Sequence, residues 1–158
     1  MLVLYMTGDL LPDAQRTSRV LGFAFYRSVL ETMTGHLSDT AIATQTFGLY
    51  MAMATGLPLV GGWLGDRLIG RKIAVGAGAL LMTSGHLALA FDRLFLLALV
   101  LLVAGAGLLR GNLSAQIKAL YAAGDRREEA AFQYYYVAVN TGLFVAPLVS
   151  GTVAAIWG

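Results

Sequence analysis

The sequence predicts an all-α membrane protein, and two properties of the chain support this fold class. Hydrophobic residues make up 58% of its 158 residues and charged residues only 13%, whereas soluble domains carry about 45–50% apolar and about 25% charged residues. Apolar stretches long enough to cross a hydrocarbon core of about 30 Å as helices recur along the chain. The sequence therefore places the protein in a lipid bilayer.

Charge and composition exclude several other classes. Basic residues number 11 and acidic residues 9, which is too small an excess to indicate nucleic-acid binding. The chain has no cysteine, so disulfides and thiolate metal sites are excluded. No zinc-protease, phosphate-loop or nucleophile motif is present, and no acidic residue lies within an apolar stretch to act as a base. We therefore expect neither enzymatic activity nor a bound cofactor or metal.

The chain divides into six predicted elements. The first eleven residues are apolar but too short to span a bilayer, and they carry no basic leader or cleavage site typical of a signal peptide. We interpret them as the end of a first helix. The elements in order are the end of that helix at 1–11, an outer loop with an amphipathic helix at 12–39, and four spanning helices at 40–62, 73–90, 94–121 and 129–157.

The helix at 40–62 has signals for its start and for its packing. Ser38 or Asp39 can accept the free backbone N–H groups of its first turn. Gly48, Ala52 and Gly56 recur every four residues, as small residues do where membrane helices approach closely. This spacing predicts a packing face for a neighbouring helix.

A run of glycines and charges follows, from Gly61 to Lys72. Asp66 lies at the end of a helix, where the helix dipole disfavours a carboxylate, so it needs a nearby cation. The usual excess of basic residues on the cytoplasmic side explains Arg71 and Lys72 but neither Asp66 nor the paired glycines. That excess also orients the chain, because Arg67, Arg71, Lys72, Lys118, Arg126 and Arg127 then lie inside and Arg16, Arg19, Arg27 and Arg93 outside.

Arg110 is the candidate binding residue of the helix at 94–121. Residues 94–109 are nearly all apolar, so Arg110 falls within the hydrocarbon region, where an arginine costs about 2.5–3.5 kcal/mol. Such a charge should face a wet cavity or a partner. Because no acidic residue lies within an apolar stretch of this chain, a ligand or a protein segment from elsewhere would supply the counter-anion. The alternative is that Arg110 extends to the cytoplasmic headgroups from its place near the helix end.

The helix at 129–157 carries a second polar face. Helical spacing brings Gln133, Tyr136 and Asn140 to one side. Pro147 shares that side and permits a kink, which membrane helices tolerate where they line a cavity. We therefore expect the three polar side chains to point into one space.

Several of these segments together resemble a known family. They are Leu109-Arg110-Gly111-Asn112-Leu113-Ser114, Leu120-Tyr121, Gly124-Asp125-Arg126-Arg127, and the run from Phe132 through Tyr135-Tyr136-Val137-Ala138-Val139-Asn140-Thr141-Gly142 to Ala146-Pro147-Leu148. They resemble the fourth and fifth helices of the proton-dependent oligopeptide transporters, a branch of the major facilitator superfamily. The stretch from Gly61 to Lys72 resembles the superfamily's signature loop between its second and third helices.

The resemblance implies a fold and a set of roles. The fold would be part of the N-terminal helix bundle of the superfamily (the end of helix 1 and helices 2 to 5), in the inner (plasma) membrane. Arg110 stands where the family usually has a lysine that contacts the carboxylate of a di- or tripeptide, and Asn140 or Tyr136 would bind the peptide backbone. The cytoplasmic gating motif would comprise Gly62, Asp66, Arg67, Gly70 and Arg71. Arginine departs from the family pattern because it offers a planar, permanently charged fork whereas a buried lysine can lose its proton.

The resemblance also implies that more helices are needed for activity. The family's proton-coupling glutamates would lie upstream of Met1, and transporters of this kind need two helical halves around a central site. We therefore expect the complete protein to import di- and tripeptides with protons, and this chain alone to be unable to transport. Two alternatives stay open: a non-transporting membrane fragment or gene remnant, and a transporter of another anionic or zwitterionic solute.

Overall fold

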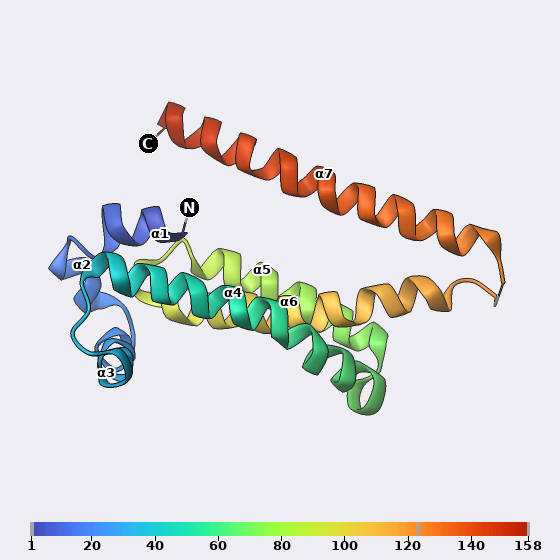
Figure 1. Ribbon diagram of the computed structural model, residues 1–158, viewed down its shortest axis with the longest axis horizontal. Coiled ribbons are helices and arrows are strands. Elements are labelled where there is room, and N and C mark those ends of the chain that lie inside the picture. Colours follow the sequence, from blue (N-terminus) through green and yellow to red (C-terminus); the bar gives the residue numbers. More distant parts are fainter. Residues whose placement is uncertain (1, 123, 158) are drawn as a thin grey trace. The chain divides into compact units, whose positions relative to one another are not determined.

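The computed structural model describes residues 2–122 and 124–157, and every regular element in that part of the chain is a helix (Figure 1). Met1, Ala123 and Gly158, which fall in predicted elements or loops, lie outside the described residues. The chain forms two compact units, one ending at Leu113 and the other starting at Ser114. Each unit is described by itself below.

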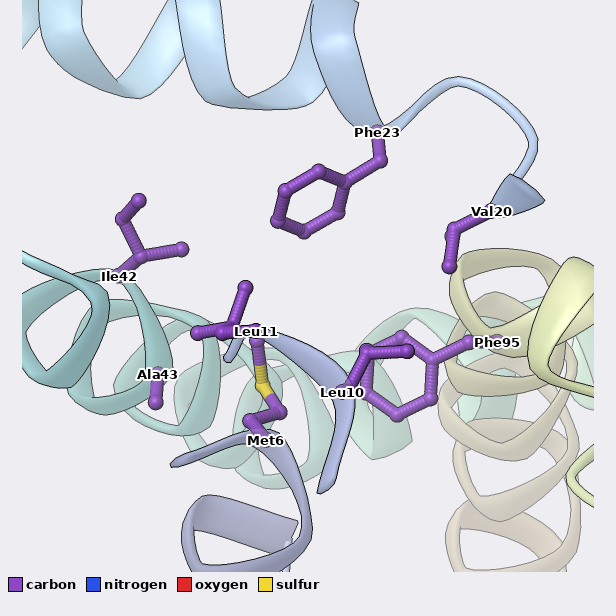
Figure 2. Close-up of a cluster of buried hydrophobic side chains, with 8 residues drawn as sticks. All are labelled: Met6, Leu10, Leu11, Val20, Phe23, Ile42, Ala43 and Phe95. Carbon is purple, nitrogen blue, oxygen red and sulfur yellow. The ribbon is translucent and has the colours of Figure 1, made fainter. Parts of the chain in front are cut away.

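The N-terminal segments of the first unit share a small apolar core. Residues 2–10 form the short helix α1 (Leu2–Tyr5) and the π-helical turn η1 (Met6–Leu10). Buried side chains meet there from η1, from the chain on either side of residues 14–19, and from the helices that contain Phe23, Ile42 and Phe95, as Figure 2 shows. The cluster consists of Met6, Leu10, Leu11, Val20, Phe23, Ile42, Ala43 and Phe95. The apolar residues Met6, Leu10 and Leu11 are thus part of the core of the first unit.

Polar contacts hold the helix α2 (Ala14–Arg19) beside this core. The Asp13 carboxylate accepts the backbone N–H groups of Gln15 at 2.9 Å and Arg16 at 3.2 Å, which caps the helix. Tyr5 donates its hydroxyl proton to Asp92 at 2.6 Å, and the Arg16 guanidinium lies 3.6 Å from the same carboxylate. Asp92 belongs to a short 3-10 turn, η3 (Asp92–Leu94). The two contacts of Asp92 thus join α1 and α2 to a turn that lies far away in the sequence.

The helix α3 (Phe23–Thr34) lies within the predicted outer loop at 12–39. Phe23 is buried in the apolar core, whereas Phe25 and Met33 are 75% and 81% exposed. Tyr26 donates its hydroxyl proton to the Thr46 hydroxyl at 2.8 Å, which attaches α3 to the next helix. The predicted amphipathic helix is therefore present, and one side of it packs against the apolar core of the first unit.

Three long helices follow: α4 (Asp39–Leu64), α5 (Arg71–Ala88) and α6 (Phe95–Ala119). Of the two residues predicted to cap α4, Ser38 takes this role, since its hydroxyl accepts the Ala41 N–H at 3.3 Å. Within the described part of the chain, three segments are long and apolar enough to cross a membrane: Asp39–Ile69, Asp92–Ala119 and Arg126–Val153. The helix α5 is not among them because it starts with Arg71 and Lys72 and contains His86. Its crossing stays a prediction.

Glycines bring α4 and α6 into backbone contact. A Cβ atom on Gly61 would lie 2.2 Å from the carbonyl oxygen of Gly107, and one on Gly111 would lie 2.2 Å from that of Pro58. No side chain fits at either position, so glycine is required for this approach. We refer to this region as the α4–α6 crossing, made by Pro58, Gly61, Gly62, Gly107 and Gly111.

Within the first unit, no described residue packs closely on the predicted face at Gly48, Ala52 and Gly56, so this packing face stays a prediction. A Cβ atom at Gly48 or Gly56 would have no neighbour within 4 Å, and Ala52 is exposed. The physical reason is that α4 packs on the rest of the first unit through its opposite face, which carries the buried residues Ala43, Ala54 and Gly61. Small residues at regular spacing permit close approach but do not by themselves specify which turn is used.

The helix α6 also packs on α5 through small residues. A Cβ atom on Gly78 would lie 2.8 Å from the carbonyl oxygen of Gly105, and one on Gly85 would lie 2.9 Å from Cγ of Leu102. Gly105, Ala106 and Gly107 are all buried. Thus α6 has one small-residue face toward α4 and another toward α5, and it forms the centre of the first unit.

The second unit contains α7 (Arg126–Trp157), which begins three residues before the predicted start at 129. The Asp125 carboxylate accepts the backbone N–H of Arg127 at 2.9 Å and pairs with its guanidinium at 2.8 Å. The hydrogen bonds from Arg127 lower the pKa of Asp125. Because this carboxylate satisfies a free donor of the first turn, the helix extends to Arg126. Gly124 precedes it with a positive φ of 84°.

Candidate substrate and gating sites

The loop at 65–71, which we call the gating loop, combines a π-helical turn, a glycine and an ion pair. The turn η2 (Gly65–Ile69) continues directly from α4. The Asp66 carboxylate pairs with the Arg71 guanidinium at the start of α5. This pair provides the cation that a carboxylate at a helix end requires. Arg67 is exposed and has no ion pair within residues 2–122 and 124–157.

Two positions of the predicted gating motif require glycine, each for a different structural reason. Gly70 separates η2 from α5 with φ 82° and ψ 140°, a conformation essentially restricted to glycine. Gly62 lies in the α4–α6 crossing, where its Cβ would be 3.1 Å from the Gly111 carbonyl oxygen. The geometry of the gating loop therefore depends on both residues, while its movement stays a prediction.

Asn112 also lies in this region. The sequence pattern did not predict that it packs between two helices. Its Nδ2 donates to the carbonyl oxygen of Gly61 on α4 at 2.8 Å and to that of Leu108 on its own helix at 2.8 Å. The side chain is completely buried. The one available signal was an amide next to glycines in an apolar helix, a combination that favours hydrogen bonding between membrane helices.

Arg110 lies two residues before Asn112, on the exposed side of α6. In the part of the chain that the structure describes, no acidic side chain is within ion-pair distance of its guanidinium. Its neighbour Gly111 packs against α4, so the α4–α6 crossing fixes how the helix turn that carries Arg110 is oriented. The charge is thus available to a partner that this set of residues does not contain.

Tyr136 and Asn140 lie one helical turn apart on α7. Asn140 Nδ2 donates to the Tyr136 carbonyl oxygen of the same helix at 2.7 Å, and the rings of Tyr135 and Tyr136 meet edge to face at 5.6 Å. Both residues belong to the second unit and Arg110 to the first. Their joint action on one ligand therefore stays a prediction. Among the described residues, no group of three or more histidine or acidic side chains could hold a metal ion.

Comparison with known sequences gives consistent results. The model of the POT family matches residues 72–157. An uncharacterized transporter of Bacillus subtilis, YclF, is 34% identical over 131 residues, which cover 80% of this chain and 27% of that protein. A di-/tripeptide transporter of Lactococcus lactis is 38% identical over 117 residues, which cover 72% of this chain and 23% of that protein. The chain thus spans about a quarter of the length of these relatives.

Solved structures show the same fold. A crystal structure of a peptide transporter POT in complex with sulfate superposes with a TM-score of 0.71 at 34% identity, covering 90% of this chain and 29% of that one. A mutant of a peptide transporter POT, also with sulfate, gives a TM-score of 0.72 at 32% identity, covering 99% and 32%. The helices described above are therefore part of a major facilitator bundle in a multi-pass protein of the inner (plasma) membrane. On this sequence and structural evidence, the chain belongs to the POT family of transporters.

Proposed function

We propose that this chain contributes helices of the N-terminal half to a transporter that imports di- and tripeptides together with protons. Arg110 takes the peptide carboxylate, and Asn140 or Tyr136 takes the polar groups of the peptide backbone. The gating loop opens and closes the cytoplasmic side. Transport, rather than catalysis or nucleic-acid binding, is the role of the complete protein.

The observation that carries this proposal is the unpaired charge of Arg110. The residue lies on a helix long and apolar enough to cross a membrane, and no acidic side chain of the described residues pairs with it. Such a cation is costly in a bilayer unless an anion or a wet cavity compensates it. A peptide carboxylate is an anion of the right geometry for a guanidinium, since its two oxygens can accept two parallel hydrogen bonds. The peptide transporters among the relatives support this choice.

Uptake of a radiolabelled dipeptide by proteoliposomes containing the complete transporter tests the proposal. Arg110→Ala should lower uptake by about tenfold or more, because hydrogen bonds to charged groups contribute about 1.5–3 kcal/mol. Arg110→Lys should retain a larger share, because the cation remains. Arg93→Ala is the matched control, since Arg93 lies in η3 before the other end of the same helix and should leave uptake unchanged.

Two further measurements separate the alternatives. An excess of unlabelled di- and tripeptides should compete with uptake, whereas competition only by another anion would indicate a different solute. A protonophore that abolishes the gradient should stop accumulation if protons drive import. Uptake by Arg110→Ala at the wild-type rate would contradict the role of Arg110.

A further inference from the structure

The Asn112 carboxamide has a fully determined orientation. It is 0% exposed, and the two groups nearest its nitrogen are the carbonyl oxygens of Gly61 and Leu108, each at 2.8 Å. Because carbonyl oxygens only accept, the amide NH2 must face them and not the amide oxygen. Oδ1 therefore points away from both, and it has no hydrogen-bond partner among the described residues.

Oδ1 is directed at the first residue of the gating loop. A Cβ atom on Gly65 would lie 1.8 Å from Oδ1, 2.5 Å from Cγ and 2.8 Å from Nδ2 of Asn112. No side-chain carbon can approach an amide so closely. Gly65 and Asn112 therefore fit together as a pair, and the carboxamide occupies the space that any other residue at 65 would need.

Stability alone does not account for an asparagine at this position. A buried acceptor without a partner is unfavourable, and replacing a buried polar group by an apolar one of similar size is often neutral. What the asparagine adds is a link between three parts of the first unit. It joins the last turn of α4 to α6, contacts the start of η2, and lies two residues from Arg110.

We infer that Asn112 is a positioning residue that couples the gating loop to the helix turn carrying Arg110. The inference deepens the proposed transport function and rests on it. Because η2 continues directly from α4, a movement of the gating loop that shifts the last turn of α4 must either break the bond from Asn112 to Gly61 or carry α6 along. The conformational step of transport therefore depends on this amide, whereas peptide binding by the Arg110 guanidinium does not require it.

The first test separates turnover from binding in the complete transporter. In Asn112→Ala, the maximal rate of dipeptide uptake should fall about tenfold, while the peptide KM stays within about twofold of wild type. Thr83→Ala is the control: its hydroxyl also donates to a carbonyl of its own helix, that of Ala79 at 3.0 Å, and forms no hydrogen bond to another helix among the described residues. It should change neither quantity. The inference would be overturned if Asn112→Ala lowered the unfolding temperature enough to explain the whole loss of uptake rate and left the gating loop unchanged. Asn112 would then be a structural residue.

The second test reads the gating loop directly and does not need transport. The chain has no cysteine, so in a complete transporter whose other cysteines are replaced by serine, Leu68→Cys introduces one labelling site at a residue of η2 that is 68% exposed. Asn112→Ala should raise its labelling rate with a membrane-impermeant maleimide by about threefold or more, because the loop is no longer held. Unchanged labelling would contradict the inference even if no peptide were transported, so this result is distinct from failure of the proposed function.

The pair itself supplies a third test. Gly65→Ala alone should disrupt uptake and loop labelling more than Asn112→Ala, since the new methyl group and the carboxamide cannot both fit. The double variant Gly65→Ala/Asn112→Ala removes the three atoms nearest the methyl group and should recover part of both losses. A double variant that is worse than either single one would show that the two residues act separately and would overturn the proposed coupling.

Discussion

The two asparagines at 112 and 140 have the same side chain and opposite surroundings. Asn112 is buried in the α4–α6 crossing and donates to a carbonyl 51 residues away in sequence. Asn140 donates only to Tyr136 of its own helix, four residues away, and is exposed within its unit. Asn112 therefore joins elements of the first unit, whereas the hydrogen bond of Asn140 stays within its own helix.

The difference teaches how this family member uses polar groups in apolar helices. Where glycines allow backbones to touch, a buried amide can reach a carbonyl of the other helix. On α7, where Leu143 and Phe144 are 65% and 71% exposed, the amide of Asn140 donates to the Tyr136 carbonyl of its own turn. Substitutions near Asn112 that leave Asn140 unchanged, and the reverse, test this comparison.

The largest effect is expected where the crossing itself is broken. Gly61→Ala places a methyl group 2.2 Å from the Gly107 carbonyl oxygen, so α4 and α6 must separate and the Asn112 bond to Gly61 is lost. We expect about 1–3 kcal/mol of destabilisation from overpacking, measured by thermal unfolding in detergent. Gly56→Ala on the same helix meets nothing within 4 Å and should be neutral or slightly stabilising. Equal effects of the two substitutions would contradict the crossing.

The next effect concerns the loop that Asn112 contacts. Gly70→Ala forces a side chain into a backbone conformation with φ 82°, which costs about 1–3 kcal/mol. Gly76→Ala, in the open part of α5, is the control because its Cβ would have no neighbour within 4 Å. We expect a lower unfolding temperature only for the former. Wild-type stability of Gly70→Ala would mean that the loop relaxes without strain.

At Asn140, we expect substitution to affect peptide binding more than stability. Asn140→Ala removes only a bond within one helix, so its unfolding temperature should stay close to wild type. If Asn140 binds the peptide backbone as proposed, the peptide KM should rise about 2- to 12-fold, the equivalent of about 0.5–1.5 kcal/mol. Peptide titrations of uptake measure the KM. A loss of stability without a change in KM would assign Asn140 a structural role in place of peptide binding.

The smallest effect is expected for a half-buried polar contact on α3. Arg27 Nε lies 3.0 Å from Glu31 Oε1 on α3, and this hydrogen bond holds the pKa of Glu31 below its ordinary value of 4.5. A lowered carboxyl pKa stabilises the folded state at neutral pH, and this contribution is lost as the pH falls through the lowered pKa. Glu31→Gln should therefore lower the unfolding temperature slightly at neutral pH and not at all in acid. Glu129→Gln is the control without an ion pair in the described residues, and a pH-independent difference for Glu31→Gln would contradict the assignment.

The class and the elements follow from the sequence because they depend on composition and local order. Apolar stretches specify spanning helices through the cost of exposing polar backbone in lipid. Caps such as Ser38 act within a few residues, as does the amphipathic pattern that predicts α3. The family follows in the same way, since its motif from Tyr135 to Gly142 is contiguous. Boundaries moved by a few residues where a side chain such as Asp125 reached the next turn.

Tertiary structure alone decided which small residues touch and which amide is buried. Gly48 and Gly61 look alike in sequence, and only the place where α6 crosses α4 makes Gly61 irreplaceable. Likewise, Asn112 lies in an apolar helix, and the structure of the first unit shows that a carbonyl of another helix, that of Gly61, is within its reach. The physical reason is that helix spacing determines which residues share a face, whereas the crossing point of two helices depends on the packing of both.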